Sequence, residues 1–157
     1  MFNLFKKKQI PLIKHQYRNL TIVLPSHWQY ELEGEDQEAC FDPKSQSTLR
    51  FNIVKAMPPT GATDEENIKF LTADQPYITT AGGYLLTGPA FKESVDSGNN
   101  ISLITWKLIN YTGAEKIMAV ITYTILSAEK ESAQEKEIFN LLENSLQNAE
   151  LSKIRTV

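Results

Sequence analysis

The sequence of 157 residues lacks several features that would assign it to a specialised class: it has one cysteine, two histidines and no long apolar run. A single cysteine cannot form an internal disulfide, so a disulfide-stapled fold is excluded. No stretch approaches the roughly 20 apolar residues that a membrane-spanning helix needs. Residues 1–18 contain neither the apolar core nor the small-residue cleavage site of a signal peptide. We therefore expect a soluble, cytoplasmic protein.

Catalytic and nucleotide-binding motifs are also missing. The sequence contains no Gly-x-Ser-x-Gly elbow, no Walker loop and no Gly-x-Gly-x-x-Gly, so it gives no support to a hydrolase, an NTPase or a dinucleotide-binding enzyme. The net charge of −3 argues against nucleic acid as a partner, because general affinity for phosphates requires a basic face.

The charges that are present are unevenly placed. Residues 1–18 carry five basic residues and no acid, whereas residues 31–42 carry six acids and no base. The acids are Glu31, Glu33, Glu35, Asp36, Glu38 and Asp42. We expect a basic N-terminal arm over residues 1–17, a single domain over residues 18–150 and a C-terminal tail over residues 151–157.

Alternating apolar residues predict strands in the first third of the chain. One strand ends at Pro25, and a hairpin follows whose loop we place at residues 34–37. This register puts Glu33 opposite Glu38 and Tyr30 opposite Phe41. It also places Cys40 on the outer side of the hairpin.

A further strand is expected over residues 48–56. In this register Cys40 would lie opposite Arg50, so the guanidinium could reach Glu38 and Asp42.

Two helices are predicted from capping boxes, in which a hydroxyl residue precedes a glutamate by three positions. Thr63 and Glu66 open a helix over about residues 64–74, and Ser132 and Glu135 open one that reaches about residue 150. Short strands are expected within residues 77–95.

Long strands over residues 101–110 and 116–126 have apolar residues on both sides, which is typical of strands covered on both faces. Trp28 and Trp106 fall within the strand alternation and are expected in the core.

The order of these elements defines an α+β fold class: an antiparallel β-sheet flanked by a mid-chain helix and a long C-terminal helix, arranged as an α/β/α sandwich. This order, together with the phrase Leu24-Pro25-Ser26-His27-Trp28, resembles the PsbP-like fold group over about residues 18–150. The group includes a photosystem extrinsic subunit, a yeast nuclear-import factor that binds the small GTPase Ran, and bacterial domains of unknown function. The resemblance implies a binding or accessory protein that is not an enzyme.

The cysteine and histidines form no recognisable catalytic or metal-binding pattern in the sequence. A thiolate nucleophile at Cys40 would need a base such as His27 within reach, and carboxylates beside the thiol would oppose its ionisation. A metal site built from His15, His27, Cys40 and Asp42 lacks any close ligand pair. We therefore expect no catalytic residue, no metal and no cofactor.

The acidic hairpin leaves two interpretations open. Arg50 could neutralise it within the fold, or the acids could dock a protein partner that has a basic surface. The candidate protein-binding residues are Glu31, Glu33, Glu35, Asp36 and Glu38.

The expected function is that of a small bacterial accessory protein that binds another protein without catalysis, with an immunity protein as one specific form. The alternative is a hydrolase or small-ligand-binding enzyme whose site lies between the sheet and the loops of residues 77–95.

Overall fold

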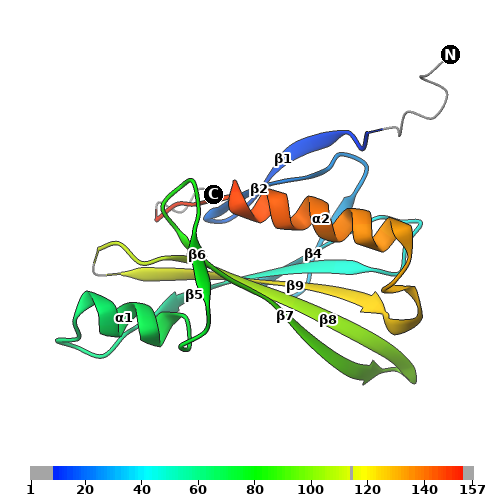
Figure 1. The fold of residues 1–157 in the computed structure, drawn as a ribbon. Helices are drawn as coiled ribbons and strands as arrows, with labels where there is room; N and C mark the ends of the chain where they lie inside the picture. Colours follow the sequence, from blue (N-terminus) through cyan, green and yellow to red (C-terminus); the bar gives the residue numbers. More distant parts are fainter. Residues whose placement is uncertain (1–8, 114, 154–157) are drawn as a thin grey trace, which may run out of the picture.

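The computed structural model describes residues 9–113 and 115–153. Over these residues the chain forms a large antiparallel sheet, a small antiparallel sheet and two α-helices (Figure 1). The elements are β1 (Leu12–Tyr17), β2 (Leu20–Pro25), β3 (Gln29–Leu32), β4 (Gln37–Phe41), β5 (Thr48–Ala56), α1 (Asp64–Leu71), β6 (Tyr77–Thr79), β7 (Leu85–Asp96), β8 (Asn99–Asn110), β9 (Lys116–Leu126), the 3₁₀ turn η2 (Ser127–Glu129), α2 (Ala133–Gln147) and β10 (Glu150–Leu151). The predicted α+β class, with an antiparallel sheet and both helices, is confirmed.

The large sheet has seven strands in the order β3-β4-β5-β9-β8-β7-β6, and the small sheet has three in the order β1-β2-β10. β9 pairs with β5 and β8 in the sheet, although α1, β6, β7 and β8 all lie between β5 and β9 in the chain. The segment from α1 to β8 is therefore inserted between two neighbouring strands. β3 and β6 form the two edges of the large sheet.

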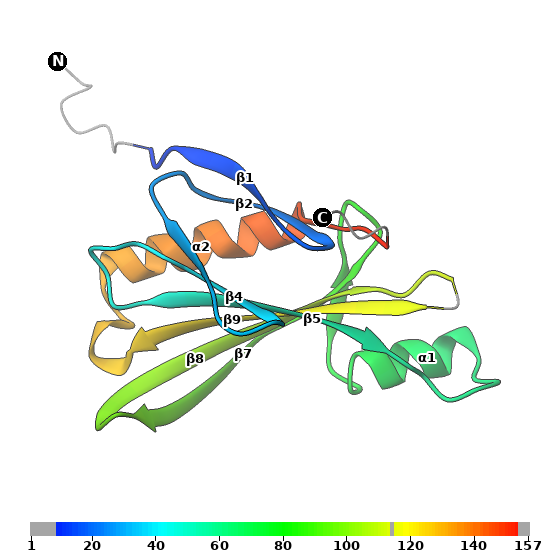
Figure 2. The same cartoon turned by 180° about the vertical axis from the view of Figure 1, so that it is seen from behind.

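One face of the large sheet is covered by α2 and by the small sheet, which lie next to each other in both views (Figures 1 and 2). The main core lies between these layers. Trp28 and Trp106 are both buried there, as predicted. The apolar stripe of α2 meets this core through Ile138, Leu142 and Leu146, as expected for a helix with one apolar face.

The opposite face of the large sheet is covered only at one end. There Leu71 of α1 packs with Leu85 of β7 and Ile109 of β8 in a second, smaller cluster. Away from α1, alternate residues of β9 such as Val120 and Thr122 are only half-buried. The prediction that the two long strands are covered on both faces is therefore wrong for most of β9, because α1 is too short to span the sheet.

The two predicted helix starts are confirmed. Thr63 caps α1, and both hydrogen bonds of its capping box are formed. α1 ends at Leu71, three residues earlier than predicted, where Ala73 and Asp74 take positive φ angles of 53° and 59° that a helix cannot contain. Ser132 caps α2 by accepting from the backbone N–H of Glu135. Neither helix of the described residues is long and apolar enough to cross a bilayer.

Two strands of the small sheet were not predicted. β1 pairs with β2 along its whole length, from Leu12 opposite Pro25 to Tyr17 opposite Leu20. β10 pairs with the other side of β2. Segments before residue 18 and after residue 150 therefore take part in the same sheet. β1 escaped prediction because its residues are mostly exposed and show no apolar alternation.

Candidate functional site

The acidic hairpin consists of β3, β4 and the loop between them, at one edge of the large sheet. Its register differs from the prediction by one residue: Tyr30 pairs with Cys40, and Leu32 pairs with Glu38. The backbone N–H of Glu33 donates to the carbonyl of Gln37 at 2.8 Å, which closes the loop. Within the loop, Gly34 takes a φ of +74° that favours glycine.

The one-residue shift moves two side chains to the core side of the sheet. Glu38 is 8% exposed and Cys40 is fully buried, whereas the prediction placed both outside. Glu31, Glu33, Glu35 and Asp36 are exposed. The structure therefore brings four of the five predicted protein-binding residues together on the exposed hairpin and places Glu38 elsewhere.

Two arginines neutralise part of this hairpin. Arg50 donates to Glu33 at 2.8 Å, and Arg18 lies 3.3 Å from the Asp36 carboxylate and also donates to the Glu35 carbonyl. The hydrogen bond from Arg50 holds the pKa of Glu33 below its usual range. Arg50 pairs with Ala39 across the sheet, so its predicted position opposite Cys40 is wrong, and its partner is Glu33 rather than Glu38 or Asp42.

Two acids of the hairpin keep unpaired carboxylates. Within residues 9–113 and 115–153, the Glu31 and Glu35 side chains form no ion pair or hydrogen bond. Apolar side chains lie on the same hairpin: Leu32 is 69% exposed and Tyr30 is 39% exposed. All four residues of β3 are exposed, and β4 is its only sheet neighbour among the described strands. This edge thus offers carboxylates, apolar surface and a strand edge together.

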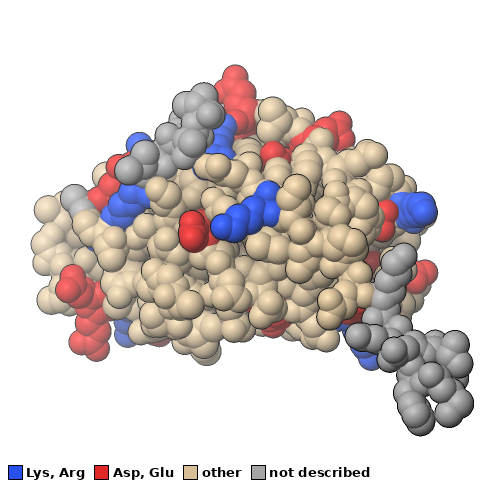
Figure 3. Space-filling view, turned by 90° about the horizontal axis from the view of Figure 1, so that it is seen from above, with Lys and Arg blue, Asp and Glu red and all other residues tan. Residues whose placement is uncertain are grey.

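The face of the molecule that carries the small sheet and α2 is different. Charged side chains of both signs are scattered over its described part, and uncharged residues make up most of it (Figure 3).

Cys40 lies beside Glu38 and His15, whereas His27 lies apart from them. The Cys40 thiol donates to Oε1 of Glu38 at 3.5 Å, and Nε2 of His15 forms a hydrogen bond with the same oxygen. Burial, with the Glu38 carboxylate beside it, raises the pKa of the Cys40 thiol strongly. His27 instead contacts Asp42 at 3.3 Å. The structure therefore does not bring Cys40 and His27 together as a nucleophile and its base.

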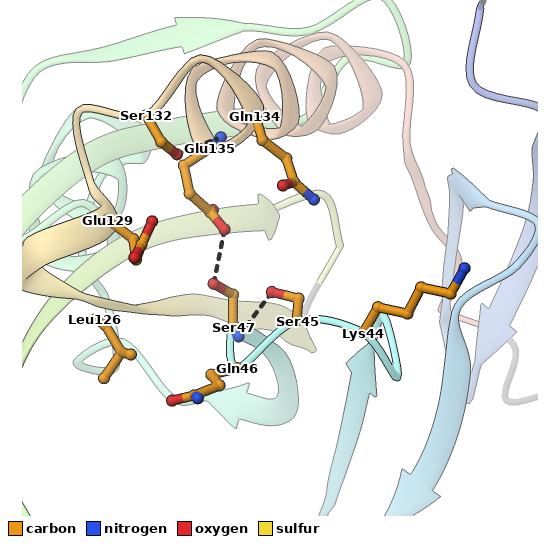
Figure 4. Close-up of a pocket in the computed structure, with 9 residues that line it drawn as sticks. All are labelled: Lys44, Ser45, Gln46, Ser47, Leu126, Glu129, Ser132, Gln134 and Glu135. Atoms are coloured by element: carbon orange, nitrogen blue, oxygen red, sulfur yellow. Dashed lines mark hydrogen bonds between the residues drawn. The ribbon is translucent and has the colours of Figure 1, made fainter.

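A polar pocket of about 210 Å³ lies between the turn that precedes β5 and the N-terminus of α2 (Figure 4). Glu135 lies beneath it and is 6% exposed. Its carboxylate accepts a hydrogen bond from Ser47 Oγ and another from the Tyr123 hydroxyl, both at 2.8 Å. The sequence predicts a capping-box role for Glu135, but its side chain enters this network instead.

The network has the geometry of a structural tie. A serine nucleophile needs a free base that can take its proton, whereas both oxygens of Glu135 already accept hydroxyl protons. Burial raises the pKa of Tyr123, which keeps its hydroxyl protonated as a donor. The signal that could have found this site is the position of Glu135 on the first turn of an otherwise apolar helix face.

The stretch of residues 77–95, proposed from sequence as one wall of an enzyme site, contributes Phe91 and Glu93 to a mostly apolar groove of about 320 Å³. The groove also contains Phe139 of α2. Glu93 at its margin accepts from Ser102 and Ser127.

No family model and no curated protein matches this chain, whereas solved structures do. A crystal structure from Bacteroides thetaiotaomicron has a TM-score of 0.55 and 16% identity, covering 86% of this chain and 46% of that one. This chain therefore spans less than half of the Bacteroides chain.

Two further structures match over nearly their whole length. The Saccharomyces cerevisiae Ran-binding protein Mog1p has a TM-score of 0.55 and 9% identity, over 91% of this chain and 96% of Mog1p. LpqN, which is involved in cell envelope biogenesis of Mycobacterium tuberculosis, has a TM-score of 0.55 and 10% identity, over 92% of each chain. Both belong to the PsbP-like fold group, so the predicted fold is confirmed. At these identities the similarity establishes the fold.

Proposed function

We propose that this chain is an accessory protein without catalytic activity that binds another protein through the acidic hairpin. The partner presents an extended segment that contains basic residues. The single observation that carries this proposal is the edge strand β3, which is exposed along its length and carries Leu32 at 69% exposure beside unpaired carboxylates.

Each part of this edge suits such a segment. An edge strand pairs with an added strand through its free backbone N–H and C=O groups. Glu31 and Glu35 attract Lys or Arg side chains, and Leu32 with Tyr30 offers apolar contact. Charges of this kind mainly raise the association rate and select the partner. The Ran-binding role of Mog1p supports protein binding as a use of this fold.

The test begins with partner identification at the proposed edge. A photo-crosslinking amino acid replaces Leu32, and the products formed in a native lysate are identified by mass spectrometry. A matched crosslinker replaces Val95, which is similarly exposed at 65% but lies on β7. We expect a partner that is labelled from position 32 and not from position 95.

The association rate with the purified partner is then measured at several salt concentrations. The double variant Glu31→Lys/Glu35→Lys is expected to associate about tenfold more slowly at low salt, and its rate should depend less on salt. The control, Glu129→Lys/Glu150→Lys, makes the same change in charge on exposed residues of η2 and β10. It should retain most of the wild-type rate. Equal rates and equal salt dependence in wild type and the hairpin variant would overturn the proposal.

A further inference from the structure

Three potential metal ligands meet beneath the acidic hairpin. His15 of β1 and Glu38 and Cys40 of β4 place Nε2, a carboxylate oxygen and Sγ within 4.8 Å of one another. The side chains of His15 and Glu38 are 12% and 10% exposed, and Cys40 is fully buried. The ligand set considered from sequence contained His15 and Cys40 but lacked Glu38, which the strand register brings beside them.

We propose that His15, Glu38 and Cys40 bind one zinc ion. An imidazole nitrogen, a thiolate and a carboxylate are the three donor types that Zn²⁺ takes in proteins, whereas a thiolate disfavours Mg²⁺ and Ca²⁺. Zinc binds these donors at about 2.0–2.3 Å, so tetrahedral ligands lie roughly 3.5 Å from one another. The Cys40 Sγ and Glu38 Oε1 atoms are already 3.5 Å apart.

The charge of the cluster favours a divalent cation. A buried carboxylate is costly unless it is paired, and a thiol that coordinates zinc loses its proton. One carboxylate, one thiolate and a neutral imidazole together balance the two positive charges of the ion. Coordination would replace the His15–Glu38 hydrogen bond, because the ion then lies between the two groups.

The neighbouring rings hold His15 in place for this role. The Tyr30 ring stacks on the imidazole at a centroid distance of 3.8 Å and an interplanar angle of 3°, and Phe51 lies at 6.3 Å. Three protein ligands leave a fourth position for water or another donor. Because His15 belongs to the small sheet and the other ligands to the large sheet, the ion would link the two sheets.

The probe is Co²⁺, added to the chelator-treated full chain, and Zn²⁺ is then titrated against a chromophoric chelator. We expect one ion per chain, a thiolate-to-cobalt charge-transfer band, and displacement of Co²⁺ by Zn²⁺. Cys40→Ala should abolish the band. Glu38→Gln, which keeps the side-chain shape, and His15→Phe, which keeps a ring on Tyr30, should each weaken Zn²⁺ binding by at least tenfold.

The control is His27→Gln, which removes the other histidine and its contact with Asp42. It should bind both metals as wild type does. Circular dichroism on every variant identifies any that fails to fold. If Cys40→Ala or His15→Phe fails to fold, Glu38→Gln is the decisive variant. The proposal is overturned by a folded wild type that binds no ion, or by binding that falls with His27→Gln and persists in Glu38→Gln.

Discussion

Glu135 is buried on the first turn of α2, although glutamate is rarely buried unless it is paired. Its carboxylate accepts from Ser47 and Tyr123, so three segments meet at one charged group: the turn before β5, strand β9 and helix α2. Breaking such a pair leaves a buried acceptor without its donor, which costs more than the hydrogen bond itself contributes. The stability of the contact between α2 and the large sheet should therefore depend on the hydroxyl groups of Ser47 and Tyr123.

Tyr123→Phe tests this dependence, because it keeps the ring and removes only the hydroxyl. We expect the free energy of unfolding to fall by about 1.5–3 kcal/mol, the range for hydrogen bonds to charged groups. Urea unfolding followed by circular dichroism gives the value. Tyr77→Phe, at an exposed tyrosine of β6, is the control and should change stability by less than about 0.5 kcal/mol. Equal values for the two variants would show that Glu135 does not need this donor.

The burial of Glu38 could not be predicted from the sequence. Glu38 was assigned to the exposed surface, because glutamate in a strand ordinarily faces water. It is buried because His15 lies opposite it on β1, and β1 itself carries no apolar alternation to reveal it. A compensating partner from a distant, unpredicted strand cannot be read from local pattern.

The elements were predicted best where local chemistry determines them. The capping residues Thr63 and Ser132 gave both helix starts correctly, since a cap depends on neighbours within one turn. The strands β5 and β9 were also predicted with their observed bounds. The β3–β4 register was wrong by one residue because it depends on what covers the hairpin, which is β1, rather than on the hairpin alone.

The β7–β8 hairpin shows how one carboxylate fastens an element to its neighbour. Glu93 of β7 accepts from Ser127 at 2.7 Å, from Lys130 at 3.0 Å and from Ser102 at 2.8 Å. Led by the Ser127 hydrogen bond, these contacts lower the pKa of Glu93 from 4.5 to about 2. The hairpin is thereby joined to the segment that leads into α2.

Glu93→Gln should consequently lower stability in a pH-dependent way. Because the folded pKa lies below the unfolded one, the carboxylate's contribution is fully present above pH 4.5 and is lost as the pH falls toward about 2. The difference in free energy of unfolding between wild type and variant should thus be constant near neutral pH and shrink in acid. Urea unfolding at each pH measures it. Ser127→Ala should reduce the same difference, and a gap that widens in acid would contradict the assignment.

At the scale of the whole molecule, Asn110 joins the large sheet to the small one, and Asn19, in the turn between β1 and β2, holds the residue that follows β10. Asn110 of β8 donates from Nδ2 to the carbonyl of Leu151 at 2.7 Å, and Asn19 donates to the carbonyl of Ser152 at the same distance. Leu20 of β2 and Leu151 of β10 are fully buried in the main core. Since both sheets contribute to one core, we expect them to unfold together as a single cooperative unit.

Asn110→Ala tests that expectation, because Asn110 is buried on the large sheet and its hydrogen bond ends on the small one. We expect the free energy of unfolding to fall by about 1–3 kcal/mol, the cost of leaving a buried group without its partner. The loss should be equal when measured by tryptophan emission in a Trp28→Phe background, which reports on Trp106 of the large sheet, and by hydrogen exchange of the β2 amides in the small sheet. Asn100→Ala, at an exposed position of the same strand, should leave both measurements nearly unchanged. A different outcome would contradict this expectation: Asn110→Ala lowers protection in β2 alone, while tryptophan emission keeps its wild-type midpoint. The small sheet would then open independently of the large one. Any link between the two sheets would have to come from another contact, such as a metal ion held between His15 and β4.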